Sequence, residues 1–178
     1  MDHGSPDLRY PIGPFQFDGD PTPRLAQWIE ELDEAPGALR AAVSGLAPEQ
    51  LDTPYRPEGW TVRQVAHHLP DSHLNAYIRC KLAVTEETPR ILPYDQDRWA
   101  NLGDNWITPV ETSLELLAAV HRRWVDFLRS LEPTAFARGF FHPEHERVLS
   151  LGETVALYAW HGRHHVAQIN ALRRRRGW

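Results

Sequence analysis

Cysteine is almost absent from this sequence. The single cysteine, Cys80, cannot form a disulfide within the chain. Because disulfides are kept mainly in oxidising compartments, a lone cysteine fits a reducing one. The first twenty residues also lack the basic and apolar regions of a signal peptide. We therefore expect a cytoplasmic protein.

Long apolar runs and a basic charge excess are missing too. No stretch approaches the roughly 20 apolar residues of a membrane span. The formal net charge of -5 gives no overall field that would attract nucleic acid or anionic lipid. A run of arginines, residues 173–176, stands where cations favourably meet a helix C-terminus. Neither a membrane nor a nucleic-acid partner is expected, which leaves a small molecule as the expected partner.

Length and composition fit one domain. A chain of 178 residues with 42% hydrophobic and 24% charged residues can bury one core. We expect a single domain over residues 1–178, with an extended arm over 1–23 and a helical body over 24–178. The arm should pack on the body through four apolar residues: Tyr10, Ile12, Phe15 and Phe17.

Apolar residues at helical spacing predict four helices. The first covers about residues 22–46, with a kink expected at Pro36-Gly37. The second starts at a Thr61-x-x-Gln64 capping box, should bend near Ala66 because of Pro70, and ends before residue 89. The third starts with Thr108 as cap, and the fourth runs from a Ser150–Glu153 capping box to about residue 174.

The connections complete the predicted architecture. Residues 89–107 form a long link that should be a lid or a crossover. Residues 138–150 fit a small hairpin or an irregular excursion. The fold class is therefore all-α, a four-helix bundle with long crossover connections after the first two helices.

Ten histidines are unusual for a chain of this size. His161 and His165 stand four apart in the fourth predicted helix, so their side chains lie on one face about 5–6 Å apart. Tyr158 and Gln168 share this face, which should point into the bundle. Two imidazoles in this arrangement can share a metal ion. The alternative is a pair of interior histidines bonded to carbonyl or carboxylate oxygens.

A third ligand would come from the middle of the second helix. His67 and His68 both lie there, and helical spacing does not decide between them. Three protein ligands leave an open coordination position, which distinguishes catalytic zinc sites from structural ones.

Several motifs together resemble the DinB-like superfamily, and most closely its YfiT branch of metal-dependent hydrolases, also described as bacillithiol transferases. The resemblance runs from Tyr10 to Trp178. It is carried by residues 10–13, 51–56, 59–64, 67–69, 71–73, 85–89 and 160–165, which read YPIG, LDTPYR, GWTVRQ, HHL, DSH, TEETP and WHGRHH.

The resemblance implies a four-helix bundle with one divalent metal ion per chain, Zn²⁺ or Ni²⁺. The family's second-helix ligand is the histidine directly before leucine, which is His68. The fourth-helix ligands are His161 and His165. Composition and the family together also suggest a homodimer.

Metal-dependent hydrolysis is the expected activity, because an ion with an open position can acidify water and polarise a carbonyl. One alternative is thiol S-transfer of the bacillithiol type, in which a low-molecular-weight thiol attacks an electrophile. Another is a non-catalytic binding module in which the metal only stabilises the helical bundle. Asp71, one turn after His68, is the candidate base. A surface hydrogen bond or an ion pair with Arg63 or Arg79 would explain Asp71 equally well.

The remaining histidines and tryptophans have less specific interpretations. His73 and His164 should be structural or line the pocket, and His142 and His145 should be solvated in a loop. Trp160 should belong to the core. Trp99 and Trp106, in the long link, should pack rather than roof a pocket.

Overall fold

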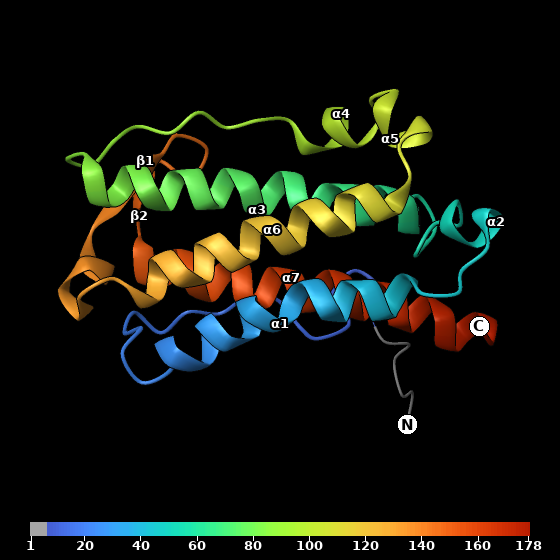
Figure 1. Cartoon of the computed structure of the whole chain (residues 1–178), viewed down its shortest axis with the longest axis horizontal. Helices are drawn as coiled ribbons and strands as arrows, with labels where there is room; N and C mark the ends of the chain where they lie inside the picture. The colour runs from blue at the N-terminus through green and yellow to red at the C-terminus, as the bar shows by residue number, and fades with distance from the viewer. Residues whose placement is uncertain (1–6) are drawn as a thin grey trace.

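Four long helices form the body of the protein in a computed structural model, which describes residues 7–178 (Figure 1). They are α1 (Leu25–Val43), α3 (Val62–Thr85), α6 (Val110–Arg129) and α7 (Leu151–Arg176). The short elements are α2 (Pro48–Leu51), α4 (Gln96–Ala100), α5 (Asp104–Ile107), the 3₁₀ turn η1 (Pro133–Ala137), β1 (Gly139–His142) and β2 (Arg147–Ser150). The predicted helical bundle is confirmed.

The order of the helices around the bundle is α1, α6, α3, α7. Helix α1 packs mainly on α7 and α6, and α3 packs on α6 and α7, so α1 and α3 are diagonal. Both predicted crossovers are present. Residues 44–61 join α1 to α3, the diagonal pair. Helices α3 and α6 run in the same direction, so the connection between them, residues 86–109 with α4 and α5, has to return along the length of the bundle (Figure 1).

Side-chain caps set the N-termini of two of the four long helices, α3 and α7. The Thr61 side chain accepts from the amide of Gln64, whose own side chain accepts from the Thr61 amide. The predicted Ser150–Glu153 capping box is only half formed. The Ser150 hydroxyl accepts from the Glu153 amide at 3.0 Å, but the Glu153 carboxylate is bound to Arg147. The predicted Thr108 cap is wrong, because α6 begins one residue later, after Pro109, and has no side-chain cap.

Proline does not interrupt either long helix that contains it. Helix α1 continues through Pro36, and α3 continues through Pro70, although each proline removes one helical donor. Pro36-Gly37 therefore does not end the first helix, and the kink expected there stays a prediction. Residues Leu32, Ala35 and Leu39 around Pro36 are buried, and this packing outweighs the lost hydrogen bond.

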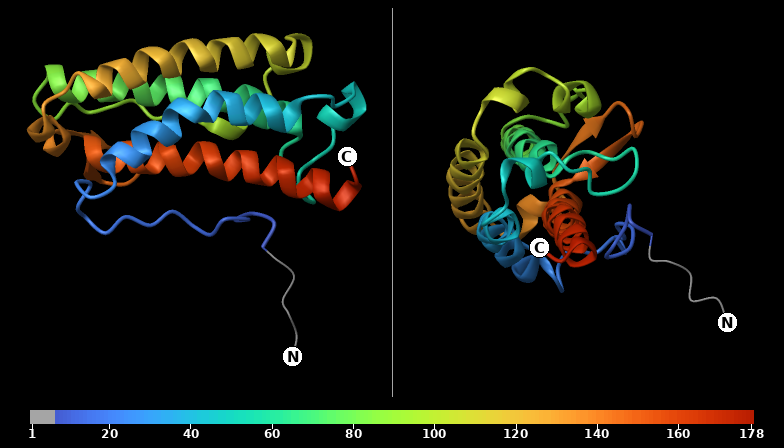
Figure 2. Two further views of the ribbon diagram at one scale, coloured as in Figure 1. Left: turned by 60° about the horizontal axis from the view of Figure 1, so that its bottom comes forward. Right: turned by 90° about the vertical axis from the view of Figure 1, so that its right-hand side faces the viewer.

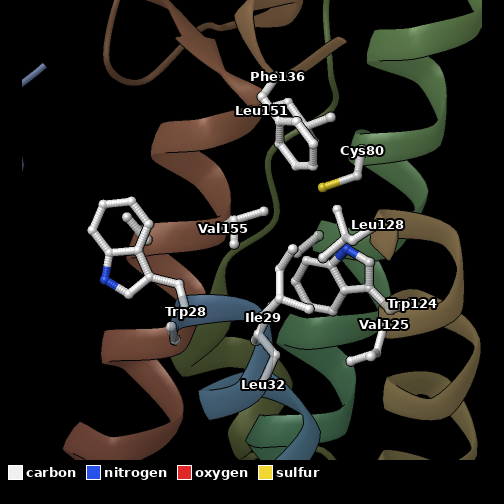
Figure 3. Close-up of a cluster of buried hydrophobic side chains, with 13 residues drawn as sticks. Trp28, Ile29, Leu32, Cys80, Trp124, Val125, Leu128, Phe136, Leu151 and Val155 are labelled. Atoms are coloured by element: carbon white, nitrogen blue, oxygen red, sulfur yellow. The ribbon is translucent and has the colours of Figure 1, made fainter. Parts of the chain in front are cut away.

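Two apolar clusters fill the two ends of the bundle. One cluster, drawn in Figure 3, includes Trp28, Ile29, Leu32, Trp124, Leu128, Leu151 and Val155. The other includes Leu39, Val62, Val65, Leu69, Leu114, Leu117 and Ile169. Along α7, residues 151–159 serve the first cluster and residue 169 the second, so His161 and His165 lie in the layer between them. This polar layer divides the core.

The N-terminal arm and the hairpin lie at the edges of the bundle. The arm runs beside α7 (Figure 2), and Phe15 and Phe17 pack against the first cluster as predicted. Tyr10 and Ile12 stay about half exposed, and residues 1–6 of the predicted arm lie outside the described residues. The predicted hairpin is the antiparallel pair of β1 and β2. Among residues 7–178, no helix is long and apolar enough to cross a membrane.

Candidate metal centre

Three histidines from two helices converge in the polar layer of the bundle. The Nε2 atom of His161 lies 3.3 Å from Nε2 of His68 and 3.2 Å from Nε2 of His165. One ring nitrogen from each of the three can be chosen so that all lie within 4.8 Å of one another. The convergence expected from the sequence is thus present between α3 and α7.

His67 points away from this cluster. Its Nδ1 atom lies 2.7 Å from the hydroxyl of Ser113 on α6. Helical spacing left His67 and His68 equivalent, and the packing of α3 between α6 and α7 decides between them. Only His68 faces α7.

Burial keeps the three imidazoles neutral. It lowers the pKa of His68 to about 4. Burial, together with the neighbouring histidines, holds the pKa values of His161 and His165 well below the ordinary 6.5. At neutral pH each ring therefore carries one proton and one lone pair, which is the form that binds a metal ion.

A chain of hydrogen bonds fixes which nitrogen of His161 carries the proton. The chain starts at the carbonyl of Leu32, which can only accept, so Nδ1 of His121 donates to it. Nε2 of His121 then accepts from Nδ1 of His73 at 2.8 Å. Nε2 of His73 accepts in turn from Nδ1 of His161 at 3.1 Å. The lone pair of His161 is thereby placed on Nε2, inside the cluster.

A second chain does the same for His165. The carbonyl of Arg9 accepts from the amide nitrogen of Gln168 at 2.9 Å, which orients the Gln168 side chain. The Gln168 oxygen then accepts from Nδ1 of His165 at 2.8 Å. The lone pair of His165 is also on Nε2. Two lone pairs that face each other at 3.2 Å repel unless a cation stands between them, so this donor set fits a metal ion.

The cluster borders two cavities. A cavity of about 630 Å³ extends from His161 toward the hairpin. Another of about 550 Å³ lies beside the N-terminal arm and contacts both His161 and His165. Gln96 of α4 also borders both cavities. His161 is the least buried of the three ligands, so small molecules can reach the cluster from two sides.

Comparison with known proteins assigns the family. Residues 31–169 match the model of the DinB superfamily. The chain belongs to the DinB superfamily. A protein of Oceanobacillus iheyensis named "Putative metal-dependent hydrolase" is 53% identical over 171 residues, which cover 96% of this chain and 98% of that protein. YfiT of Bacillus subtilis, named in the same way, is 47% identical over 175 residues and 98% of each chain.

A solved structure supports the same relationship. It is described as YfiT from Bacillus subtilis, "a probable metal-dependent hydrolase with an unusual four-helix bundle topology". It matches this DinB-superfamily chain with a TM-score of 0.93 and 47% identity, over 96% of this chain and 98% of the other. The expected family and fold are confirmed.

The role of Asp71 stays a prediction in this DinB-superfamily chain. Burial, and secondarily the charge of Asp104, raise the pKa of Asp71 to about 6. Among residues 7–178 the carboxylate makes no ion pair with Arg63, which bonds to Asp52 instead, or with Arg79. No hydrogen bond joins it to His68, His161 or His165 within the same residues. A pKa near neutrality is nevertheless what a general base needs.

For the histidines outside the three-histidine cluster and for Trp160, the structure confirms some predictions and corrects others. His73 bonds to His161, and His164 lines the smaller cavity, as expected. Trp160 is not a core residue: it is partly buried, lines the same cavity and stacks on His164 with ring centroids 4.4 Å apart. His142 is not solvated, because the last position of β1 turns it inward and leaves it 8% exposed. His145 is exposed as expected.

His121 belongs to the site although the sequence pattern did not predict it. It is 1% exposed and sits on α6 among Leu117, Val120 and Trp124. A histidine inside an otherwise apolar helical stripe was the available signal, since a buried imidazole needs a hydrogen-bond partner. Trp60 was also unassigned, and it packs edge-on against His68 with ring centroids 4.6 Å apart.

Proposed function

We propose that this protein is a metal-dependent hydrolase whose ligands are His68, His161 and His165. The observation that supports it most is the pair of Nε2 lone pairs, on His161 and His165, held 3.2 Å apart by two hydrogen-bond chains. One divalent ion per chain, Zn²⁺ or Ni²⁺, would bind there. Such an ion supplies a Lewis acid that polarises a carbonyl and acidifies water. The names of the relatives agree with this activity.

The protein's own residues supply the setting for this chemistry. The three ligands are neutral, so the site keeps the full charge of a bound ion. Trp60 covers one side of His68 and is held by a hydrogen bond from its ring nitrogen to Asp97 at 3.0 Å. The cavities on either side of His161 leave room for a substrate. We assign Asp71 as the general base.

Metal analysis tests this proposal. Protein purified without a histidine tag or chelator should contain about one metal ion per chain by mass spectrometry. His68→Ala, His161→Ala and His165→Ala should each contain almost none, whereas the exposed control His145→Ala should match the wild type. The proposal fails if the wild type stays metal-free after incubation with zinc and with nickel.

Thiol S-transfer is the second candidate, and the two cavities favour it. Hydrolysis needs one organic substrate beside water, but transfer of a thiol needs two reactants at the same centre. Cavities of about 630 and 550 Å³ that share His161 would accommodate both. The zinc- or nickel-loaded protein should be assayed with ester and amide substrates, and with small thiols plus an electrophile. Product formation that requires the thiol would select transfer over hydrolysis.

A further inference from the structure

The larger cavity is built from four separate parts of the chain. Helix α3, the segment 93–96, the β1–β2 hairpin and α7 each form part of its wall. His161 borders it, so the cavity opens onto the proposed metal centre. A ligand in the cavity would therefore place one end beside the reacting centre and the other near the hairpin.

Arg79 is a buried cation in this cavity wall. It is 8% exposed, and its Nη2 atom donates to the carbonyl of Leu92 at 3.1 Å. Among residues 7–178, no carboxylate lies within ion-pair distance of its guanidinium. The nearby Arg147 is already bound to Glu153 by two hydrogen bonds. Burying an unpaired charge is costly, so a site that retains one is suited to an anionic ligand.

His142 adds a second unsatisfied group. It is 8% exposed, lines the same cavity, and its Nδ1 atom has no hydrogen-bond partner within the described part of the chain. Burial lowers the pKa of His142, so the ring is neutral at pH 7 and donates one N–H. A buried polar atom without a partner is uncommon in native proteins, and a bound ligand is one way to satisfy it.

We propose that this cavity binds the carboxylate of an organic acid, with Arg79 and His142 as donors and the reacting part of the molecule beside His161. A guanidinium matches the two oxygens of a carboxylate in a bidentate bond. The exposed acidic residues Asp95 and Glu144 also line the cavity, which favours a monoanion over a more highly charged phosphate ester. The reaction rests on the proposed metal-dependent function, but the binding of the carboxylate does not.

The position of Arg79 limits the length of the substrate. Arg79 lies 11 residues after His68 on α3, and a rise of 1.5 Å per residue puts their Cα atoms about 16 Å apart. Thr154 and Tyr158, on the facing part of α7, line the space between. The substrate is thus a small molecule whose carboxylate is remote from the bond that reacts.

Benzoate and benzamide form a matched pair of probes, since they share a shape and differ in charge. Binding is measured by ligand-observed NMR and calorimetry on metal-free protein, so that no metal–carboxylate bond contributes. Benzoate should bind about tenfold or more tightly than benzamide. Arg79→Gln and His142→Phe should each weaken benzoate binding, Arg79→Lys should restore part of it, and the exposed control Arg123→Gln should not change it.

Two outcomes overturn the proposal. One is equal affinity of the wild type for benzoate and benzamide. The other is an affinity for benzoate that equals that of the wild type in both Arg79→Gln and His142→Phe, after circular dichroism has shown that both variants are folded. His165→Ala separates this proposal from the metal site, because His165 is a predicted ligand but does not line this cavity. That variant should bind benzoate normally and bind no metal.

Discussion

The carbonyl oxygen of Leu32 is free to accept a hydrogen bond from Nδ1 of His121 because Pro36 stands four residues further along α1. A residue with an amide hydrogen at position 36 would bond to that carbonyl, and proline has none. A proline in one helix therefore starts a hydrogen-bond chain that passes through His121 and His73 and ends at His161, on another helix.

This chain predicts a loss of metal affinity when its members are removed. His73→Phe takes away the acceptor that orients His161, and His121→Phe takes away the acceptor that fixes the proton of His73. In each variant the metal affinity should fall about 10–100-fold while binding remains detectable. Competition with a chromogenic chelator measures the change. His145→Phe, at an exposed histidine, is the control. Wild-type affinity in both folded variants would show that the chain does not orient the ligand.

The stability of the metal-free protein should fall as the pH falls below about 6.5. Burial lowers the pKa of His121 to about 4, and the unfolded value is near 6.5, so the unfolded state binds more protons between these values. Stability is full above pH 6.5 and is lost progressively toward pH 4. His121 alone should account for roughly 3 kcal/mol, from the difference between 6.5 and about 4.

Urea unfolding from pH 7 to pH 4 measures this effect. His121→Phe should show a shallower dependence on pH than the wild type, because it removes one of the buried groups that must stay neutral. An equally steep dependence in the variant would place the titrating groups elsewhere.

Asp71→Asn tests the proposed general base. The loaded enzyme should lose about 10²- to 10⁴-fold in kcat, the usual contribution of a general base, while its metal content stays at the wild-type level. Activity of the wild type should rise with pH through about 6, where Asp71 loses its proton. An unchanged kcat would exclude this role.

Asp104→Asn is the matched control for the same residue. The charge of Asp104 is the second cause, after burial, of the raised pKa of Asp71. Its removal should move the acidic limb of the pH–rate profile to lower pH. A profile that does not move would contradict the assignment of that limb to Asp71.

Metal loading should stabilise the fold through the three ligands. An ion that binds only the folded state adds about 2.7 kcal/mol at a free concentration of 100 times Kd. Calorimetric melting of the metal-free protein with and without zinc should show a rise of roughly 5–10 °C. His68→Ala should show no rise. A large rise in the melting temperature of the wild type, without activity on any substrate panel, would favour the alternative in which the metal only stabilises the bundle.

Local signals in the sequence were enough for the helices and most of their ends. Thr61 and Gln64 form the predicted capping box because both partners lie within one helical turn. His161 and His165 share a face for the same reason, since a spacing of four is a local property. Thr108 failed as a cap because helix ends shift by a residue when several start signals compete.

The packing of the helices decided which histidine side chains meet at the site. His67 and His68 were equivalent by spacing until α3 packed between α6 and α7. The apolar stripe around His121 signalled that the histidine is buried, but not what it bonds to. The bonding partner of His121 and the cavity beside His142 belong to other elements of the fold.

The sequence by itself determined the helices, the shared face of His161 and His165, and a family resemblance that pointed to His68. Only the tertiary structure decided which ring nitrogens carry protons and which cavity holds an unpaired arginine. Hydrogen bonds along one helix depend on neighbours in the chain, whereas the chain from Leu32 to His161 joins atoms of four helices and exists only once those helices have packed.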